Sequence, residues 1–83
     1  MKRVTFSKQS ARFLRRTPVN VATLILSKIN QYAEDPRSLG NNVTRLQGRE
    51  GFRLRVGDWR VIFDDDGMVL AILEIGPRGG VYN

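Results

Sequence analysis

A chain of 83 residues, 41% apolar and 27% charged, has the length and composition of one globular domain over residues 1–83, with no apolar run long enough to cross a membrane. It has no Cys and no His, which excludes disulfides, zinc–thiolate and iron–sulfur centres, thiol nucleophiles and imidazole bases, so we expect no metal or cofactor. Because residues 4–10, after Lys2 and Arg3, do not form the apolar region of a signal peptide, we expect a cytoplasmic protein. The formal charge is +6, with 11 Arg against 3 Lys, which favours a polyanionic partner such as nucleic acid, although an arginine-rich coding preference would give the same count.

The N-terminal residues are predicted to form a short strand and then a helix. Apolar Val4 and Phe6 alternate with polar neighbours, as one face of a strand requires. Ser7 follows with a hydroxyl that can accept a hydrogen bond from a free backbone N–H. We therefore expect Ser7 to cap a helix over Lys8–Arg16.

A second helix is expected directly after the first, and the two would form a hairpin. Thr17 is assigned as its N-cap and Pro18 as its first helical residue, where the missing N–H is not needed. Pro36 ends the helix, because the proline ring restricts the backbone of Asp35. Apolar residues recur at spacings of three and four and predict one buried face: Val21, Ala22, Ile25, Ile29, Tyr32 and Ala33.

The second half of the chain is rich in predicted strands. Residues 37–51 are expected to form a loop that Leu46 anchors. Three strands joined by tight turns then follow, over residues 52–56, 59–63 and 68–75. The order β-α-α-β-β-β predicts an α+β fold, in which an antiparallel sheet carries the N-terminal helical hairpin on one face.

The turn Gly57-Asp58 determines how the first two of these strands pair. Glycine at the first position suits a type II′ turn, which places Arg55 opposite Arg60. One face of the hairpin would then be core: Phe52, Leu54, Val56, Trp59, Val61 and Phe63. The other face carries Arg53, Arg55 and Arg60. Because opposed like charges destabilise a sheet, this face predicts an anion between the arginines, either a phosphate or a carboxylate.

Glu74 is the carboxylate that could neutralise the arginines from within the chain. If the turn after Phe63 uses three residues, Arg60 lies opposite Ile72 and Glu74 is diagonally near it on the same face. If the turn uses two, Glu74 points toward Trp59 in the core, which is unfavourable for an acid. We favour the first register. An exposed ion pair contributes about 0–1 kcal/mol, and one carboxylate does not balance three arginines, so anion binding is favoured as the function of this face.

The C-terminal segment supplies two more candidate residues. Arg78 lies among glycines and a proline that allow a ligand to approach closely, although an ordinary terminal turn would have the same composition. Tyr82 could stack on a base or bond a sugar hydroxyl, or it could cover the edge of the sheet. The run Asp64-Asp65-Asp66 is interpreted as a solvated turn and not as a metal site, because neighbouring side chains at a strand end point in alternate directions.

The arrangement resembles the RelE/ParE toxin superfamily. Residues 52–63, FRLRVGDWRVIF, are similar to its aromatic-R-L-R-V-G-D-aromatic-R-V-I segment, and residues 76–82, GPRGGVY, to its C-terminal G-H-R-x-x-V-Y segment. The helical hairpin and the element Leu46-Gln47-Gly48 also fit, so the resemblance spans nearly the whole chain. It implies the βααβββ fold of small microbial ribonucleases and the toxin of a type II toxin–antitoxin pair, which a cognate antitoxin protein neutralises.

Within the superfamily the resemblance favours the RelE-like members, which cut mRNA in the ribosomal A site. It implies a metal-independent endoribonuclease (an mRNA interferase) that inhibits translation, with the ribosome and mRNA as partners. Arg60 would hold the scissile phosphate, Arg78 would stabilise the transition state or protonate the leaving oxygen, and Tyr82 would contact the nucleotide and help to activate its 2′-hydroxyl. Arg53 and Arg55 would bind RNA phosphates at positions where RelE-type enzymes often carry Lys.

Two departures from this pattern support an alternative. Arginine cannot act as a base as a buried lysine can, and Pro77 replaces the His that is common before Arg78. A ParE-like toxin inhibits DNA gyrase without nuclease activity and needs neither group. A third interpretation, a nucleic-acid-binding module that is neither toxin nor enzyme, needs only the charge of +6. Because Arg60, Arg78 and Tyr82 are all present, we favour an endonuclease that positions the 2′-hydroxyl in line and neutralises the phosphorane with arginines.

Overall fold

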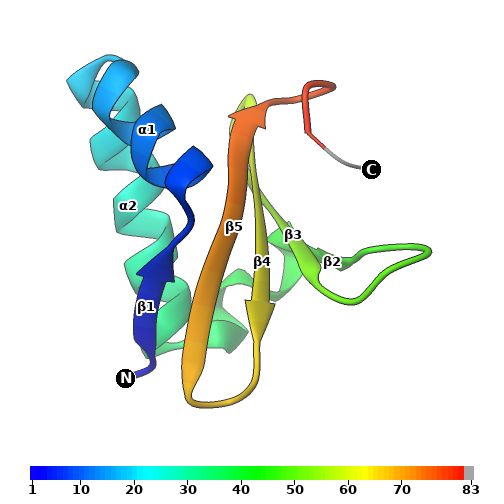
Figure 1. Cartoon of the computed structure of the whole chain (residues 1–83). Coiled ribbons are helices and arrows are strands. Elements are labelled where there is room, and N and C mark those ends of the chain that lie inside the picture. Colours follow the sequence, from blue (N-terminus) through cyan, green and yellow to red (C-terminus); the bar gives the residue numbers. More distant parts are fainter. Residues whose placement is uncertain (82–83) are drawn as a thin grey trace.

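A five-stranded sheet carries two α-helices on one of its faces (Figure 1). The computed structural model describes residues 1–81. Its elements are β1 (Arg3–Phe6), α1 (Lys8–Arg16), α2 (Val19–Glu34), the 3₁₀ segment η1 (Pro36–Asn42), β2 (Val43–Arg45), β3 (Phe52–Val56), β4 (Trp59–Asp65) and β5 (Val69–Pro77). The strands lie in the order β1-β5-β4-β3-β2, so the first and last strands of the chain are neighbours. None of the helices described is long and apolar enough to cross a membrane.

The predicted α+β class is confirmed, and the sheet is mixed. The pairs β2–β3, β3–β4 and β4–β5 are antiparallel as predicted, whereas β1 runs parallel to β5. Alternation of apolar and polar residues shows which face of a strand is buried but not which way the strand runs. The strand β2 lies inside the segment predicted as a loop, because three residues are too few to show alternation.

Helix α1 has the bounds and the cap that the sequence predicts. Ser7 Oγ accepts a hydrogen bond from the backbone N–H of Ser10 at 3.1 Å. The predicted start of α2 is wrong by one residue. Thr17 closes α1, since its N–H donates to the Phe13 carbonyl at 2.9 Å, and Pro18 is the N-cap of α2. The carbonyl of Pro18 accepts hydrogen bonds from the N–H groups of Val21 and Ala22, and no side chain caps the start of α2.

The core lies between α2 and the apolar face of β3, β4 and β5. Phe63 lies at its centre, with its ring centroid 4.9 Å from that of Tyr32 and 5.4 Å from that of Phe52. Trp59, which the sequence places in the core, is half-buried at its margin and packs edge-to-face on Phe13 at 5.7 Å. The buried core residues are Ile25, Ile29, Tyr32, Ala33, Leu39, Leu54, Val56, Val61, Phe63, Leu70, Ile72 and Ile75.

Side chains from the start of α1 cover the edge of β5 where β1 has ended. Ser7 Oγ donates to the Leu73 carbonyl at 2.7 Å. The Gln9 amide donates to the Ile75 carbonyl at 2.8 Å and accepts from the Ile75 N–H at 2.9 Å. Gln9 thus takes the place of a strand and leaves both backbone groups of Ile75 bonded, which protects the edge from further pairing.

Candidate anion-binding site

The hairpin of β3 and β4 carries the candidate site. Gly57 has a φ of +58° and Asp58 a negative φ, which is the combination that a type II′ turn requires. The predicted register is confirmed, with Arg55 opposite Arg60. Arg53, Arg55 and Arg60 therefore share the face of the sheet that points away from the core.

A pocket of about 190 Å³ lies among these arginines. The hairpin contributes three residues and the segment from η1 to β2 contributes the others: Arg53, Arg55, Arg60, Asn41, Asn42 and Thr44. None of the six is acidic, and guanidinium, amide and hydroxyl groups all donate hydrogen bonds to phosphate oxygens. Small-molecule pockets usually measure about 300–1,000 Å³, so this arginine pocket suits a single charged group such as a phosphate.

Arg60 is oriented by the turn that precedes it. Its Nη1 donates to the carbonyls of Gly57 and Trp59, both at 2.8 Å. Within residues 1–81, its Nε and Nη2 atoms make no hydrogen bond. The turn therefore holds one nitrogen of the guanidinium and leaves two for a phosphate, which arginine grips best with two parallel N–H groups.

Arg78 is joined to the same turn by its backbone. Its N–H donates to the Asp58 carbonyl at 2.8 Å, and the Gly80 N–H donates to the Pro77 carbonyl at 2.9 Å. With a φ of +84° at Gly79, this is a type II turn with Arg78 at its second position. The side chain of Arg78 is exposed and does not line the arginine pocket, so the structure brings the backbone of this residue, but not its guanidinium, to the site.

The chain after this turn folds back over the arginine face, which is the face of the sheet that carries Arg53, Arg55 and Arg60. Val81 is only 7% exposed and belongs to a small apolar cluster with Leu46 and Ile62. Gly76 permits this return, because a Cβ there would lie 2.9 Å from Val81 Cγ1. Tyr82 lies outside the described residues, and its role in the site stays a prediction.

Substituting Gly76 by alanine is expected to displace Val81 and to lower the free energy of unfolding by about 1–3 kcal/mol, as overpacking does. Urea unfolding of the variant measures this loss. In Gly76→Ala/Val81→Ala the clash is gone, so the double variant should lose less than the sum of the two single variants. Additive losses would contradict this role for Gly76.

Glu74 lies on the arginine face, as predicted, but in a different register. Arg60 pairs with Gly76 and not with Ile72, because β4 continues to Asp65 before the chain turns, and a β-bulge beside Ile62 then shifts the pairing by one further residue. Glu74 consequently lies opposite Ile62. Within residues 1–81 no ion pair joins Glu74 to Arg60, the arginine that the sequence prediction placed diagonally near it.

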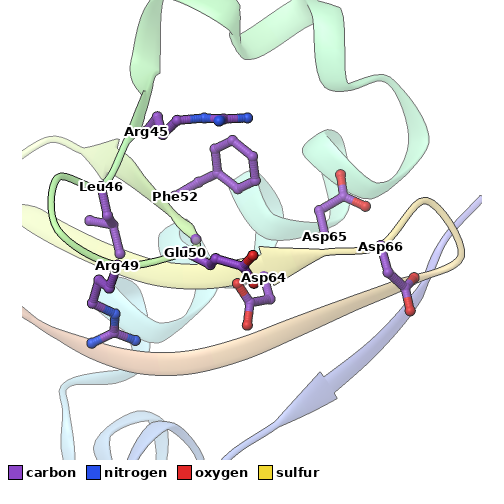
Figure 2. A pocket seen from close by; sticks show the side chains of 9 residues that line it. Arg45, Leu46, Arg49, Glu50, Phe52, Asp64, Asp65 and Asp66 are labelled. Carbon is purple, nitrogen blue, oxygen red and sulfur yellow. The ribbon is translucent and has the colours of Figure 1, made fainter.

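A larger pocket, of about 680 Å³, lies between the β2–β3 loop and the end of β4 (Figure 2). Arg45 reaches across the ring of Phe52, with its guanidinium carbon 5.6 Å from the ring centroid. Arg49 lines the same pocket together with Glu50 and the acidic run at residues 64–66. These carboxylates repel a phosphate, so the larger pocket is less suited to an anion than the smaller one.

The acidic run at residues 64–66 stabilises the turn between β4 and β5 and makes contacts with neighbouring elements. The carboxylates of Asp64, Asp65 and Asp66 point apart (Figure 2). Asp65 pairs with Lys2 Nζ at 3.1 Å and accepts from Tyr32 OH at 3.3 Å. Burial, and then the nearby Asp65 charge, raises the pKa of Tyr32. Within residues 1–81 no three acidic side chains come close enough to hold a metal ion together.

Asp66 makes the stability of this turn depend on pH. Its Oδ1 accepts hydrogen bonds from the N–H groups of Val69 at 2.7 Å and Met68 at 2.9 Å, which lower the pKa of its carboxyl below the ordinary 3.8. The Asp66 carboxyl therefore binds a proton less tightly in the folded chain than in the unfolded chain. Its contribution to the free energy of unfolding is complete above the pKa of the unfolded chain, and it is lost as the pH falls through the lower pKa of the folded chain. We expect the difference in unfolding free energy between wild type and Asp66→Asn to shrink between about pH 5 and pH 2. A pH series of urea midpoints checks this, and a constant difference would contradict it.

Three residues of the arginine pocket are absent from the sequence prediction. Asn41, Asn42 and Thr44 lie in the segment predicted as a loop, far in sequence from the hairpin. The Asn42 amide donates to the Arg55 carbonyl at 3.4 Å, a contact between the end of η1 and β3. The Val-Thr dipeptide after the asparagines is the one local signal for β2, since both residues favour strands.

Neither a protein-family model nor a curated protein matches the chain. Solved structures do match. The archaeal RelE–RelB complex of Pyrococcus horikoshii OT3 has 28% identity, covers 96% of this chain and 98% of the other, and superimposes with a TM-score of 0.76. The toxin–antitoxin complex RelBE2 of Mycobacterium tuberculosis has 22% identity, coverage of 93% and 91%, and a TM-score of 0.73. The isolated E. coli RelE toxin has 20% identity, coverage of 93% and 84%, and a TM-score of 0.69.

Proposed function

Since this chain belongs to the RelE/ParE toxin superfamily, we propose that it is the toxin of a type II toxin–antitoxin pair and that it cleaves mRNA on the ribosome. The observation that carries the proposal is the opposed pair Arg55 and Arg60, which lines a pocket without any acidic residue. Two arginines directly across a sheet repel each other, and a phosphate between them removes that repulsion. RNA supplies such a phosphate at every nucleotide.

The chemistry proposed is cleavage by the neighbouring 2′-hydroxyl. The 2′-oxygen bonds to phosphorus, the bond from phosphorus to the 5′-oxygen breaks, and a 2′,3′-cyclic phosphate and a 5′-hydroxyl result. Arg60, held at Nη1 by the turn, grips the scissile phosphate with Nε and Nη2. Arg53 and Arg55 bind the same or the adjacent phosphate.

The other end of the reaction is assigned to the C-terminal turn. Arg78 stabilises the negative charge on the leaving oxygen, which takes its proton from water, and Tyr82 contacts the nucleotide. Because arginine stays protonated at neutral pH, neither Arg53 nor Arg55 removes the proton of the 2′-hydroxyl, and this proton passes to water. Catalysis then depends on aligning the 2′-oxygen with the bond that breaks, and the ribosome supplies that alignment. Holding two reacting groups in line accelerates intramolecular reactions by a large factor.

We propose a cognate antitoxin as the second partner. We also propose that the chain acts in the cytoplasm. The solved RelE proteins from P. horikoshii and M. tuberculosis are held in complexes with an antitoxin. Residues 1–63 of this chain contain 13 basic and 4 acidic residues, so an acidic partner would associate quickly and cover the arginine face.

A ParE-like inhibitor of DNA gyrase is the second candidate function. Arg53 and Arg55 stand where RelE-type enzymes often carry Lys, and Pro77 stands where they often carry His. A toxin that only binds its target needs neither a base nor an acid at these positions.

Pulse labelling in a bacterial host separates the two functions. After induction of the chain, we expect incorporation of labelled methionine to fall first, with reporter mRNA cut inside its coding region. Gyrase inhibition would instead leave mRNA intact and produce DNA breaks and a damage response. Growth without arrest would favour a nucleic-acid-binding module over both toxins.

A further inference from the structure

The arginine pocket has one polar wall to which the proposed reaction assigns no role. Asn41, Asn42 and Thr44 form this wall, and they come from the segment that joins η1 to β2. The arginines of the hairpin carry hydrogen-bond donors only, so they recognise phosphate oxygens. DNA and RNA have the same phosphate group. A preference for RNA in this pocket must therefore come from the polar wall.

Asn42 is the residue of this wall whose amide is held in one orientation. Its side chain is half-buried, and its Nδ2 donates to the Arg55 carbonyl at 3.4 Å. Because a carbonyl accepts hydrogen bonds and cannot donate them, this contact determines which end of the amide is nitrogen and which is oxygen. Within residues 1–81 the Oδ1 atom of Asn42 makes no hydrogen bond. Asn42 therefore adds an oriented acceptor to a pocket whose arginines only donate.

The other two side chains of the polar wall are less constrained. Asn41 and Thr44 are both exposed, and no hydrogen bond within residues 1–81 holds either side chain. A free amide can turn to present nitrogen or oxygen, and a hydroxyl can rotate to donate or accept. Both residues can consequently adapt to a phosphate, whereas the contact with Arg55 prevents Asn42 from doing so with Oδ1.

We propose that Asn42 makes the arginine pocket selective for ribonucleotides by accepting a hydrogen bond from the 2′-hydroxyl. This hydroxyl is on the sugar carbon next to the one that bears the 3′-phosphate, so a phosphate held by Arg55 and Arg60 brings it to the polar wall. DNA has no hydroxyl to offer there. The substrate class of the pocket is then a ribonucleoside 3′-phosphate, an assignment that rests on the proposed function in placing a phosphate between the arginines.

The same hydrogen bond orients the nucleophile of the proposed cleavage. When Oδ1 of Asn42 accepts from the 2′-hydroxyl, the lone pairs of the hydroxyl oxygen are free to face phosphorus. An amide does not take up a proton at neutral pH, so the proton of the hydroxyl still passes to water as the 2′-oxygen bonds to phosphorus. Asn42 is therefore a binding and orienting residue and not a base.

Three nucleotides that differ only at the 2′-position test the selectivity on the wild-type chain. They are adenosine 3′-monophosphate, its 2′-deoxy form and its 2′-O-methyl form, and NMR titration of the isotope-labelled chain measures each Kd. We expect the ribose form to bind about 3–10-fold more tightly than the other two, the effect of one neutral hydrogen bond. The 2′-O-methyl form keeps the oxygen but has no hydrogen to donate. If it binds as tightly as the ribose form, or if all three bind alike, the proposal is wrong.

Substitutions in the polar wall locate the selectivity. In Asn42→Ala we expect the three probes to bind with equal affinity, to within about twofold. Thr44→Val removes a hydroxyl from the same wall and should keep the preference for the ribose form. Asn30→Ala is the matched control, because Asn30 is exposed on α2 and does not line the pocket, and it should bind every probe as wild type does. A ribose preference that survives in Asn42→Ala, or that is lost in Thr44→Val, would overturn the proposal.

Arg60→Ala shows whether the probes occupy the arginine pocket. We expect this variant to bind all three probes roughly 10-fold or more weakly, because each loses a charged hydrogen bond to its phosphate. Wild-type affinity in Arg60→Ala would place the probes elsewhere and would overturn the proposal. If mRNA cleavage is never observed but the ribose preference depends on Asn42, the proposed function fails and the selectivity stands. If mRNA is cut and the probes bind alike, the selectivity fails and the proposed function stands.

Discussion

Alanine in place of Arg60 is expected to lower the rate of ribosome-dependent mRNA cleavage by about 10²–10³-fold, and alanine in place of Arg78 by a similar factor. Each arginine is proposed to stabilise charge that develops on the phosphate or on the leaving oxygen, and losing one such donor has effects of this size in other enzymes. Primer extension on a reporter mRNA in a purified translation system measures the rate.

The fold should survive both substitutions. Arg78 is exposed, and Arg60 contributes two hydrogen bonds to its own turn but is not part of the core. Urea midpoints close to that of wild type are therefore expected for Arg60→Ala and Arg78→Ala. Arg15→Ala is the control for loss of one positive charge and should cut at the wild-type rate. Wild-type cleavage by Arg60→Ala and Arg78→Ala, both folded, would contradict the assigned roles.

The second large effect is expected in the core. Phe63→Ala should lower the free energy of unfolding by about 3–5 kcal/mol, the range for truncating a buried aromatic side chain. Phe63 is 1% exposed and lies between the rings of Tyr32 and Phe52, so its loss leaves a cavity bounded by the helix on one side and the sheet on the other. A domain of this size has a total stability of about 4–12 kcal/mol, so the variant should be close to unfolding at 25 °C.

Urea unfolding followed by circular dichroism measures this loss. Met68→Ala is the matched control, because Met68 is 78% exposed in the turn before β5 and its substitution should change stability by no more than about 0.5 kcal/mol. A loss below about 1 kcal/mol for Phe63→Ala would show that the helices and the sheet do not meet around this ring.

The parts of the fold that the sequence predicts correctly are those that local chemistry determines. Ser7 has the side chain to cap α1, and it does so. The turn Gly57-Asp58 has two residues with one suitable conformation, so the pairing of Arg55 with Arg60 follows from the turn alone. The buried face of α2 follows from apolar spacing.

The parts that the sequence does not predict depend on contacts between distant segments. The bulge beside Ile62 shifts the register of β5, and no local pattern marks it. Thr17 has a suitable hydroxyl for a cap but is used to close the preceding helix. The parallel direction of β1 and the approach of Asn42 to Arg55 are set by where the chain returns to the sheet.

The candidate site also has one part that the sequence predicts and another part that depends on contacts in the folded chain. Arg53, Arg55 and Arg60 come from one hairpin, so their shared face is predictable from alternation. The bonds from Arg60 Nη1 to the carbonyls of its own turn depend on a side-chain conformation that alternation does not determine. Arg78 reaches this hairpin through one backbone hydrogen bond to Asp58, which no sequence motif encodes.

Primer extension on one reporter mRNA, with and without ribosomes, tests the central claim most directly. The purified chain is added at equal concentration to translating ribosomes and to free mRNA, with Arg78→Ala beside wild type. We predict cuts within codons that require ribosomes and that Arg78→Ala makes far more slowly. A folded wild-type chain that leaves mRNA intact on translating ribosomes would contradict the claim and would favour inhibition of DNA gyrase, a function that needs neither Lys nor His in the site.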